Sequence, residues 1–534
     1  MGFYDENWDF GIMQQALWTG SHGQGFYNSG SSETIGASSF FQVHPSFMLY
    51  PLAAIYWVFP SGFTLLAVQS VVVALAAIPL YALTVSITRS SGKSLWVAVL
   101  YLAWTPLLAS QMYDVHLEAF LPLELFSLFY FWYLERWVAT VVSAVVAMLT
   151  LEIGPLFVIS TALFFLVPQV RWGWLERIKG HLLGRPQSGA WQASSELRLA
   201  WPERRTILMG LFMGVLAGAT YLLLRMLQGP WSSIILGGSV PSSGKQWGFT
   251  PSSLGLGWGF LEDFLGAKLE YWVLVYALVL FVPLLCPRAL LLGLPWMLFT
   301  FFSPDLNYVS IGFQYSLVAA YGVFVGMAFG VRKLPVTTLR AFVARFVSSI
   351  RALVRSRGSR FPGLRELYRS GGLVAGLAIV LVVNLAVGPA NPLTTTPSER
   401  DAYPPGYWNS FDHPPGFQDV QRLAQLVPVG AYVVATTELF PFVANNVHAY
   451  SFYWYPTNGS YLPFNASHLP QFVLYSDEFA PTVPSWLSAA IFKNYEFGLR
   501  ASVVCTSVGS VYLYELGYSW WGPVYLQSDC TGHS

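Results

Sequence analysis

Long blocks of apolar residues dominate the first three quarters of the chain. Phe63–Ile87 and Leu373–Val387, for example, contain no charged residue. A helix that crosses a bilayer needs about 20 consecutive, mainly apolar residues. The pattern therefore predicts about ten membrane spans, over residues 62–88, 94–110, 117–134, 137–151, 153–168, 206–228, 271–286, 289–303, 314–331 and 371–389.

The count depends on residues 137–168, which are short for two full spans and have Glu152-Ile153-Gly154-Pro155 in their middle. A single span would place the basic loop that follows outside the cytoplasm, against the usual distribution of Lys and Arg. Two short crossings that meet outside near Glu152 keep that loop inside. We therefore predict two spans here.

The pattern changes after residue 390, where the apolar blocks stop and Pro, Asn, Ser and Tyr become frequent. Short strands alternating with helices predict a small α/β domain over residues 390–534. The expected elements are helices at Val420–Leu426 and Trp486–Lys493 and strands at Tyr432–Thr436, Phe472–Tyr475, Ser502–Thr506 and Val511–Tyr514. The predicted fold is thus a mainly α, polytopic membrane bundle (62–389) with a C-terminal α/β domain.

Composition and charge support this reading and orient the chain. Only 10% of the residues are charged, against about 25% in soluble proteins. Of 28 Lys and Arg, seven lie in 169–205 and ten in 332–370, which predicts that both loops are cytoplasmic. The C-terminal domain is then extracytoplasmic, on a multi-pass protein of the plasma membrane. The loops lack the interleaved aromatics of a nucleic-acid-binding module, so we expect no nucleic-acid partner.

Residues 1–61 form an extracytoplasmic first loop in this topology. Met1–Phe10 contains no basic residue and does not look like a signal peptide, so we expect a further helix upstream. Phe47–Phe59 is too short to span easily and contains Pro51, which favours an interfacial or re-entrant segment. In the exterior domain, Cys505 and Cys530 are able to form a disulfide, and the sequence leaves this pairing open.

Carboxylates and imidazoles gather at the predicted outer surface. They are Asp9, His44, Asp114, His116, Glu118 and Glu152. Such groups suit activation of an acceptor hydroxyl by a general base, or coordination of a divalent cation, for which Asp114 and His116 are the candidate ligands. The structural alternative is that they cap helix ends and tie loops together. Arg225, near the outer end of 206–228, is a candidate partner for a phosphate, or a side chain that snorkels to the headgroups.

These residues also carry a resemblance. The chain resembles the GT-C superfamily of membrane glycosyltransferases and, more closely, an uncharacterised family of predicted archaeal and bacterial membrane proteins. The matching pieces are Trp8-Asp9-Phe10-Gly11 with Gln15 and Trp18, His44-Pro45 leading to Pro51, Asp114-x-His116-x-Glu118, Gln314-Tyr315, and Val433-Val434-Ala435-Thr436 followed by Pro441.

The resemblance implies a polyprenyl-phosphate-linked sugar donor used on the extracytoplasmic face, with Asp9 as the base. The predicted catalytic residues are Asp9, Asp114 and His116. The predicted substrate-binding residues are Glu118, His44, Glu152, Arg225, Gln314 and Tyr315. The expected partners are membrane lipid and a lipid-linked sugar, with a divalent cation as a candidate cofactor.

Two other classes of function stay open at this point. A non-enzymatic membrane scaffold or complex subunit would use the exterior domain to bind partners. A transporter would show internal repeats and polar groups near the bilayer midplane, whereas the sequence has no evident repeat and its polar groups gather at the outer surface. The enzyme reading differs from the scaffold reading in requiring that Asp9, Asp114 and His116 converge on one cavity.

Overall fold

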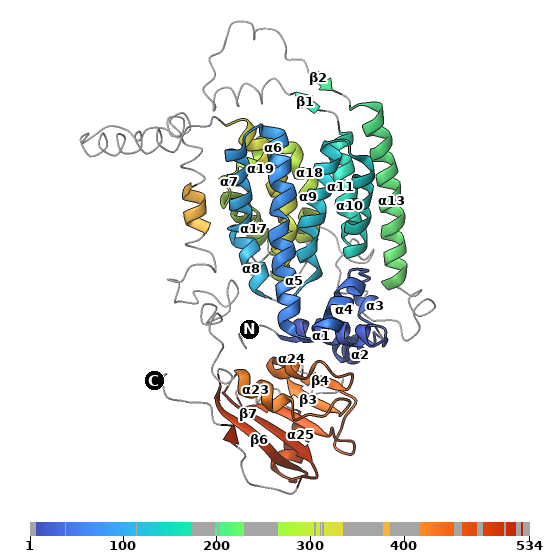
Figure 1. The fold of residues 1–534 in the computed structure, drawn as a ribbon, viewed down its shortest axis with the longest axis vertical. Helices are drawn as coiled ribbons and strands as arrows, with labels where there is room; N and C mark the ends of the chain where they lie inside the picture. Colours follow the sequence, from blue (N-terminus) through green and yellow to red (C-terminus); the bar gives the residue numbers. More distant parts are fainter. Residues whose placement is uncertain are drawn as a thin grey trace, which may run out of the picture.

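The apolar blocks form a bundle of helices in the computed structural model, with a smaller mixed domain at one end (Figure 1). The structure describes residues 7–37, 39–113, 115–167, 169–171, 198–200, 202–228, 265–303, 306–309, 311, 314–334, 378–384, 417–452, 462–477, 484–506, 509–518 and 525–526. Asp114, Cys530 and most of the two basic loops lie outside these ranges, as do the side chains of Cys505 and Gln314.

The bundle occupies the middle of the chain. Its helices are α5 (Gly62–Leu75), α6 (Ala77–Thr88), α7 (Ser91–Leu102), α8 (Thr105–Tyr113), α9 (Leu121–Tyr133), α10 (Trp137–Thr150), α11 (Gly154–Leu166), α13 (Arg204–Gln228), α17 (Leu265–Ala277), α18 (Leu290–Phe302) and α19 (Ala320–Arg332). Short 3₁₀ turns join or extend them: η1 (Leu117–Phe120), η4 (Val282–Leu285), η5 (Pro287–Ala289), η6 (Leu306–Val309) and η7 (Gln314–Ala319). At the far end, β1 (Gln169–Arg171) pairs antiparallel with β2 (Arg198–Ala200).

Three helices in the described part of the chain are long and apolar enough to cross a membrane. They are Gly62–Thr88, Arg204–Leu227 and Tyr315–Arg332, and a fourth results if Ser91–Leu102 and Thr105–Gln111, bent by 44°, form one span. Other predicted spans contain shorter apolar helices, including α10 and α11 on either side of Glu152. The chain is therefore mainly helical with several apolar helices, and the total of about ten spans stays a prediction.

Helix α19 forms the centre of the bundle. Over Tyr315–Arg332, 83% of the apolar window is buried, against 22% for α13 at the edge. Gly322, Gly326 and Gly330 recur every four residues on one face, where a Cβ on Gly322 would lie 2.8 Å from the Gly293 nitrogen. Small residues at this spacing allow helix backbones to approach closely in membranes. The glycines thus explain how α19 packs against α18 and η4.

The first sixty residues fold into a helical cluster beneath the bundle, at the end opposite β1 and β2 (Figure 1). Its helices are α1 (Asn7–Ser21), α2 (Ser29–Ile35), α3 (Phe40–Val43) and α4 (Leu49–Val58). The predicted interfacial segment corresponds to α4, whose outer side exposes Tyr50, Trp57 and Phe59. The cluster attaches to the bundle where the Phe47 N–H donates to the Leu149 carbonyl at 2.8 Å.

The C-terminal domain contains a six-stranded mixed sheet in the order β4-β3-β5-β7-β6-β8. Its strands are β3 (Val433–Thr436), β4 (Ala449–Phe452), β5 (Phe472–Ser476), β6 (Phe497–Thr506), β7 (Gly509–Leu516) and β8 (Tyr525–Leu526). Strand β3 pairs parallel with β4 and β5, while β7 pairs antiparallel with β5 and β6. The helical elements are α23 (Phe417–Ala424), η9 (Thr437–Leu439), α24 (Phe440–Val443) and α25 (Ser485–Phe492).

The two faces of this sheet contribute to different cores. Val433 and Ala435 belong to the apolar core that is continuous with the helical cluster and the bundle. Val434, between them, belongs to a second core that includes Leu487 and Ile491 of α25. Burial on both faces explains why β3 is a continuous apolar run rather than an alternating one.

Helix α1 joins the C-terminal domain to the rest of the protein. The buried Gln15 amide donates to the carbonyls of Asn446 (2.7 Å) and Ala449 (3.1 Å), and its oxygen accepts from the Ser29 N–H at 2.8 Å. Gly11 lies directly against Phe440, and any Cβ at this position would overlap the ring. The domain is therefore docked on the N-terminal cluster through specific polar and apolar contacts.

Candidate functional site

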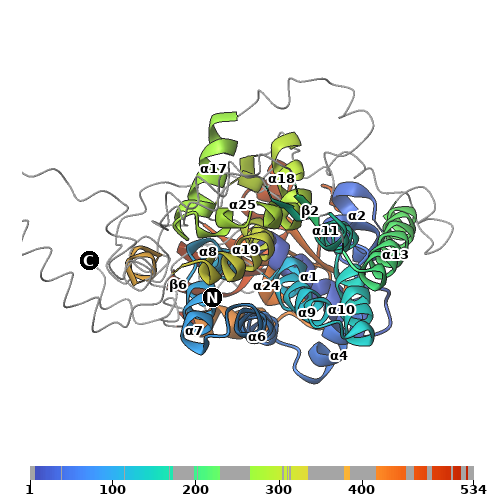
Figure 2. The ribbon, with the colours of Figure 1, turned by 90° about the horizontal axis from the view of Figure 1, so that it is seen from above.

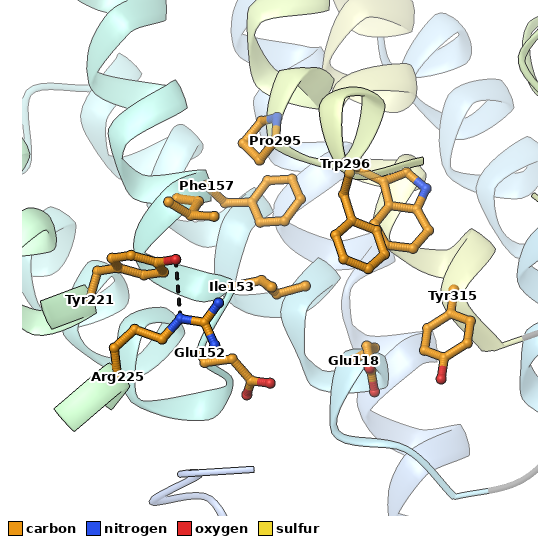
Figure 3. Close-up of a pocket in the computed structure, with 11 residues that line it drawn as sticks. Glu118, Glu152, Ile153, Phe157, Tyr221, Arg225, Pro295, Trp296 and Tyr315 are labelled. Carbon is orange, nitrogen blue, oxygen red and sulfur yellow. Dashed lines mark hydrogen bonds between the residues drawn. The ribbon is translucent and has the colours of Figure 1, made fainter. Parts of the chain in front are cut away.

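A cleft opens at the end of the bundle that faces the N-terminal cluster. It contains about 610 Å³ of space, part of it open to the surroundings. Its walls come from η1, α11 and the residues just before α11, α13, α18 and η7, so segments nearly 200 residues apart in sequence meet there. The lining residues are Glu118, Glu152, Ile153, Leu156, Phe157, Tyr221, Arg225, Pro295, Trp296, Phe299 and Tyr315 (Figure 3).

Glu152 owes its position to the tight turn between α10 and α11. Pro155 occupies the first turn of α11, where its missing N–H costs no hydrogen bond. Gly154 lies so close to the Ala147 carbonyl that a Cβ would collide with it. The turn therefore brings the Glu152 carboxylate to the cleft while leaving only 3% of the residue exposed.

In the described part of the chain, Glu152 is hydrogen-bonded through one of its two carboxylate oxygens. Its Oε1 atom lies 3.0 Å from Nδ1 of His44, just after α3. Its Oε2 atom has no hydrogen-bond partner within the described part of the chain. A buried carboxylate oxygen without a partner is costly, and it is able to accept a hydrogen bond or a proton from a bound molecule.

The surroundings of His44 determine its charge. Burial opposes the protonated ring and lowers its pKa, but the charges of Glu152, Glu118 and Asp9, with the hydrogen bond to Glu152, outweigh burial, so the net pKa is raised. Asp9, in the first turn of α1, is half-buried. Its influence on His44 means that an acid of the N-terminal cluster acts electrostatically on the cleft.

His116 behaves differently from His44. Burial, together with the nearby His44, lowers the pKa of His116 to about 3, so its ring is neutral near pH 7. Its backbone N–H donates to Oε1 of the buried Gln69 at 2.8 Å. A neutral imidazole is a poor partner for an anion. Among the described residues, no group of three or more His, Cys, Asp or Glu side chains is arranged to hold a metal ion.

Arg225 provides the positive charge that lines the cleft. Its Nε donates to the Tyr221 hydroxyl at 3.2 Å, and its guanidinium lies 5.6 Å from the centre of the Tyr221 ring. Because these residues are four apart in α13, they occupy the same helix face. Figure 3 shows Arg225 on the same side of the cleft as Glu152, with Glu118 and Tyr315 across from them.

Aromatic rings form another wall. Trp296 stacks on Phe299 with ring centres 5.3 Å apart, and Tyr308 bridges Phe299 (4.7 Å) and Tyr315 (4.5 Å). The Trp296 indole N–H donates to the Tyr271 hydroxyl at 3.1 Å, which fixes the ring. The cleft thus has an aromatic wall and a charged wall, a combination suited to a molecule with apolar and polar parts.

Several predicted site residues therefore lie together, and others do not line the cleft. Glu118, Glu152, Arg225 and Tyr315 line it, and His44 contacts Glu152. Asp9 and His116 interact electrostatically with His44 without lining the cleft. Asp114 and the Gln314 side chain lie outside the described residues. The sequence reasoning missed Tyr221, Phe157 and Trp296, although Tyr221 stands one helical turn before Arg225.

A family model described as "Predicted membrane protein (DUF2079)" matches residues 3–496, nearly the whole chain. The chain belongs to this family. The match bears out the predicted relation to a family of predicted membrane proteins, and its description names no activity. The chain matches no curated protein and no solved structure.

The DUF2079 match covers every part from which the cleft is built. It includes the N-terminal cluster with His44, the bundle with Glu152 and Arg225, and the C-terminal domain through α25. The part of the docked C-terminal domain through α25 is therefore matched together with the bundle, and β6, β7 and β8 lie beyond the match.

Proposed function

We propose that this chain is a membrane glycosyltransferase that takes a sugar from a polyprenyl-phosphate-linked donor on the extracytoplasmic face. The observation that carries the proposal is the composition of the cleft. It combines two buried carboxylates, Glu118 and Glu152, with the guanidinium of Arg225 and an aromatic wall, at one end of an apolar bundle. A headgroup can reach these residues from the membrane surface while its lipid chain stays among the helices.

Each wall matches one part of the reaction. The acceptor hydroxyl would attack the anomeric carbon, the bond from that carbon to the phosphate oxygen would break, and polyprenyl phosphate would leave with the electron pair. Arg225 would stabilise the phosphate, because guanidinium binds phosphate oxygens well. Trp296 and Tyr315 line the cleft, where a sugar would pack against the aromatic wall.

Glu152 is the general base in this proposal. Its Oε2 atom is buried, without a hydrogen-bond partner among the described residues, and at the cleft, so it can take the proton of the acceptor hydroxyl. His44 would hold the carboxylate through Oε1 and stabilise its charge. Asp9, the base expected from the resemblance, would act on the same cleft through its influence on His44. Mutating Glu152 and Asp9 one at a time shows which of the two carboxylates is the base.

The orientation is part of the proposal. Basic residues gather at the opposite end of the bundle from the cleft: Lys93 Nζ donates to the carbonyls of Val331 and Leu334, and Lys333 Nζ donates to that of Leu285. An excess of Lys and Arg on one side marks the cytoplasmic side. This supports an extracytoplasmic cleft and C-terminal domain, with about ten spans in all.

The test is turnover in membranes from cells with and without the protein. The probes are polyprenyl-phosphate-linked hexoses labelled in the polyprenyl chain, and the measurement is the release of polyprenyl phosphate. We expect Glu152→Gln to lower the rate by about 10²–10⁴, the usual contribution of a general base, with normal expression. A similar loss in Asp9→Asn, with Glu152→Gln active, would assign the base to Asp9 instead.

Glu124→Gln is the matched control. Glu124 is also a buried glutamate, accepts a hydrogen bond from Thr150 at 2.7 Å, and does not line the cleft. Its variant makes the same glutamate-to-glutamine change away from the cleft and should keep turnover near the wild-type rate. If the wild-type protein releases no polyprenyl phosphate from any probe, the enzyme proposal fails. The alternative, a scaffold that binds partners through the C-terminal domain, would then be preferred.

A further inference from the structure

An apolar strip runs along the bundle from the cleft, on α11 and α13. On α11 it consists of Leu156, Ile159 and Leu163, which are partly exposed although their neighbours along the helix are buried. On α13 it consists of Gly214 and Gly218, where a Cβ would meet no atom within 4 Å. Leu156 also lines the cleft, so the strip and the cleft are continuous.

Contacts on either side fix the direction in which the α11 part faces. Leu166 packs on α13, with its side chain 2.7 Å from where a Cβ on Gly210 would lie. Ser160 packs on α18, with its hydroxyl 3.4 Å from the Leu292 carbonyl oxygen. At 100° per residue, Leu156, Ile159 and Leu163 point between these two contacts. Figure 2 shows α11 between α13 and α18.

The part of the strip on α13 also ends at the cleft. Gly210, Gly214, Gly218, Tyr221 and Arg225 recur every three or four residues and so share one side of the helix. That side begins at the close contact with Leu166 and ends at the cleft. At 1.5 Å per residue it is about 22 Å long, somewhat more than one leaflet of a hydrocarbon core about 30 Å thick.

We infer that this strip binds the hydrocarbon chain of a polyprenyl phosphate whose phosphate lies at Arg225. The inference rests on the proposed function and extends it to the chain of the donor. No atom of the described residues lies within 4 Å of a Cβ built on Gly214 or Gly218, which leaves room beside α13 that branched isoprene units can fill. The buried Oε2 of Glu152, without a partner in the described residues, lies at the cleft where the strip ends and is able to accept a hydrogen bond from a polar headgroup there.

The test places larger side chains in the strip and measures the binding of lipid instead of turnover. In Gly214→Leu/Gly218→Leu, the added side chains enter open space, so the fold should tolerate them. Ala219→Leu is the matched control, because it adds the same side chain to an exposed position on a different side of α13. Purified full-length protein is mixed with undecaprenyl phosphate or the short geranyl phosphate, and bound lipid is counted by native mass spectrometry.

We expect the double variant to bind undecaprenyl phosphate at least about tenfold more weakly, since losing the burial of two methylenes already has that effect. Binding of geranyl phosphate and the melting temperature should not change, and Ala219→Leu should behave like the wild type. Normal binding of undecaprenyl phosphate by the double variant would overturn the assignment of the strip as the lipid site and would leave the proposed function standing. The inference would also be overturned if the double variant bound both lipids equally weakly, or if it lost a bound phospholipid instead of undecaprenyl phosphate. If the wild type binds neither polyprenyl phosphate, the strip and the proposed donor fail together.

Discussion

His44 Nδ1 lies 3.0 Å from Glu152 Oε1, although the two residues are 108 positions apart in the chain. This pair connects the N-terminal cluster to the start of α11. The cleft therefore depends on the docking of the first sixty residues, since Glu152 lines the cleft and His44 does not. A change at His44 should act on Glu152 without removing any side chain from the walls of the cleft.

The His44–Glu152 pair predicts a particular pH dependence of stability. His44 lies outside the predicted spans, and its folded-state pKa is raised despite burial by Glu152, Glu118 and Asp9. A raised pKa means that the protonated ring stabilises the fold below its unfolded pKa of about 6.5, and that this stabilisation is lost as the pH rises through the folded pKa. In His44→Gln, we expect a melting temperature lower by a few degrees at about pH 6, with a smaller difference at about pH 9.

Thermal unfolding of the purified protein between these pH values measures the effect. His22→Gln is the control, because His22 is exposed and its ring hydrogen-bonds, among the described residues, to Ser21 and the Trp18 carbonyl of the adjoining helix α1. A difference between wild type and His44→Gln that grows as the pH rises would contradict the assigned charge state.

Gln15 predicts how firmly the C-terminal domain is attached. Its amide satisfies two carbonyls of that domain and the Ser29 N–H, all buried. In Gln15→Leu the Ser29 N–H loses this acceptor, and the Asn446 and Ala449 carbonyls each lose one of two donors. A buried polar group left unsatisfied costs about 1–3 kcal/mol. We expect lower stability and faster proteolytic release of the C-terminal domain, read by gel after limited proteolysis. Gln24→Leu, at an exposed position, should change neither quantity.

The sequence predicted the secondary structure well where the signal is local. The predicted strand Tyr432–Thr436 corresponds to β3, and the predicted helix Trp486–Lys493 to α25. Strand β4 was missed, because its four residues lie among Pro and Asn and become a strand only by pairing with β3. Helix α1 was missed too, because it is covered by two domains and shows little amphipathic pattern.

The candidate site was partly accessible to sequence reasoning for the same reason. Glu152 was predicted to lie at an outer turn from the Glu152-Ile153-Gly154-Pro155 break between two short apolar runs and from the basic loop that follows, and both signals are visible along the chain. The 3.0 Å contact with His44 and the aromatic wall at Trp296 depend on how distant helices pack. No periodicity in one sequence encodes those distances.

Asn384 predicts that the last apolar block belongs to the bundle. This buried side chain accepts hydrogen bonds from the Thr105 N–H (2.9 Å) and hydroxyl (3.0 Å), at the break between α7 and α8. Its amide also donates to the Leu278 carbonyl at 2.8 Å. In Asn384→Leu, the first N–H of α8 is left without this acceptor, so we expect a loss of about 1–3 kcal/mol in unfolding free energy.

Val383→Leu is the control for that measurement, because Val383 is 40% exposed and lies beside Asn384 in the helical segment of residues 378–384. Denaturant unfolding in detergent should show a clear loss for Asn384→Leu and almost none for Val383→Leu. Equal stability of both variants would mean that the contact with Thr105 contributes little to holding the last block against the bundle.

The charge distribution predicts the orientation of the whole protein. Gly92 lies exposed in the first turn of α7, beside Arg89 and Lys93, and a Cβ there meets no atom of the described residues within 4 Å. Val429 is 81% exposed on the C-terminal domain, at the other end of the molecule. Cysteines at these positions, in a chain whose three native cysteines are replaced by serine, report which end faces outward.

In sealed cells, a maleimide that does not cross membranes should label Val429→Cys. It should label Gly92→Cys only after permeabilisation, because basic turns are retained in the cytoplasm. The reverse pattern would place the cleft on the cytoplasmic side, where an extracytoplasmic sugar donor could not reach Glu152 and Arg225.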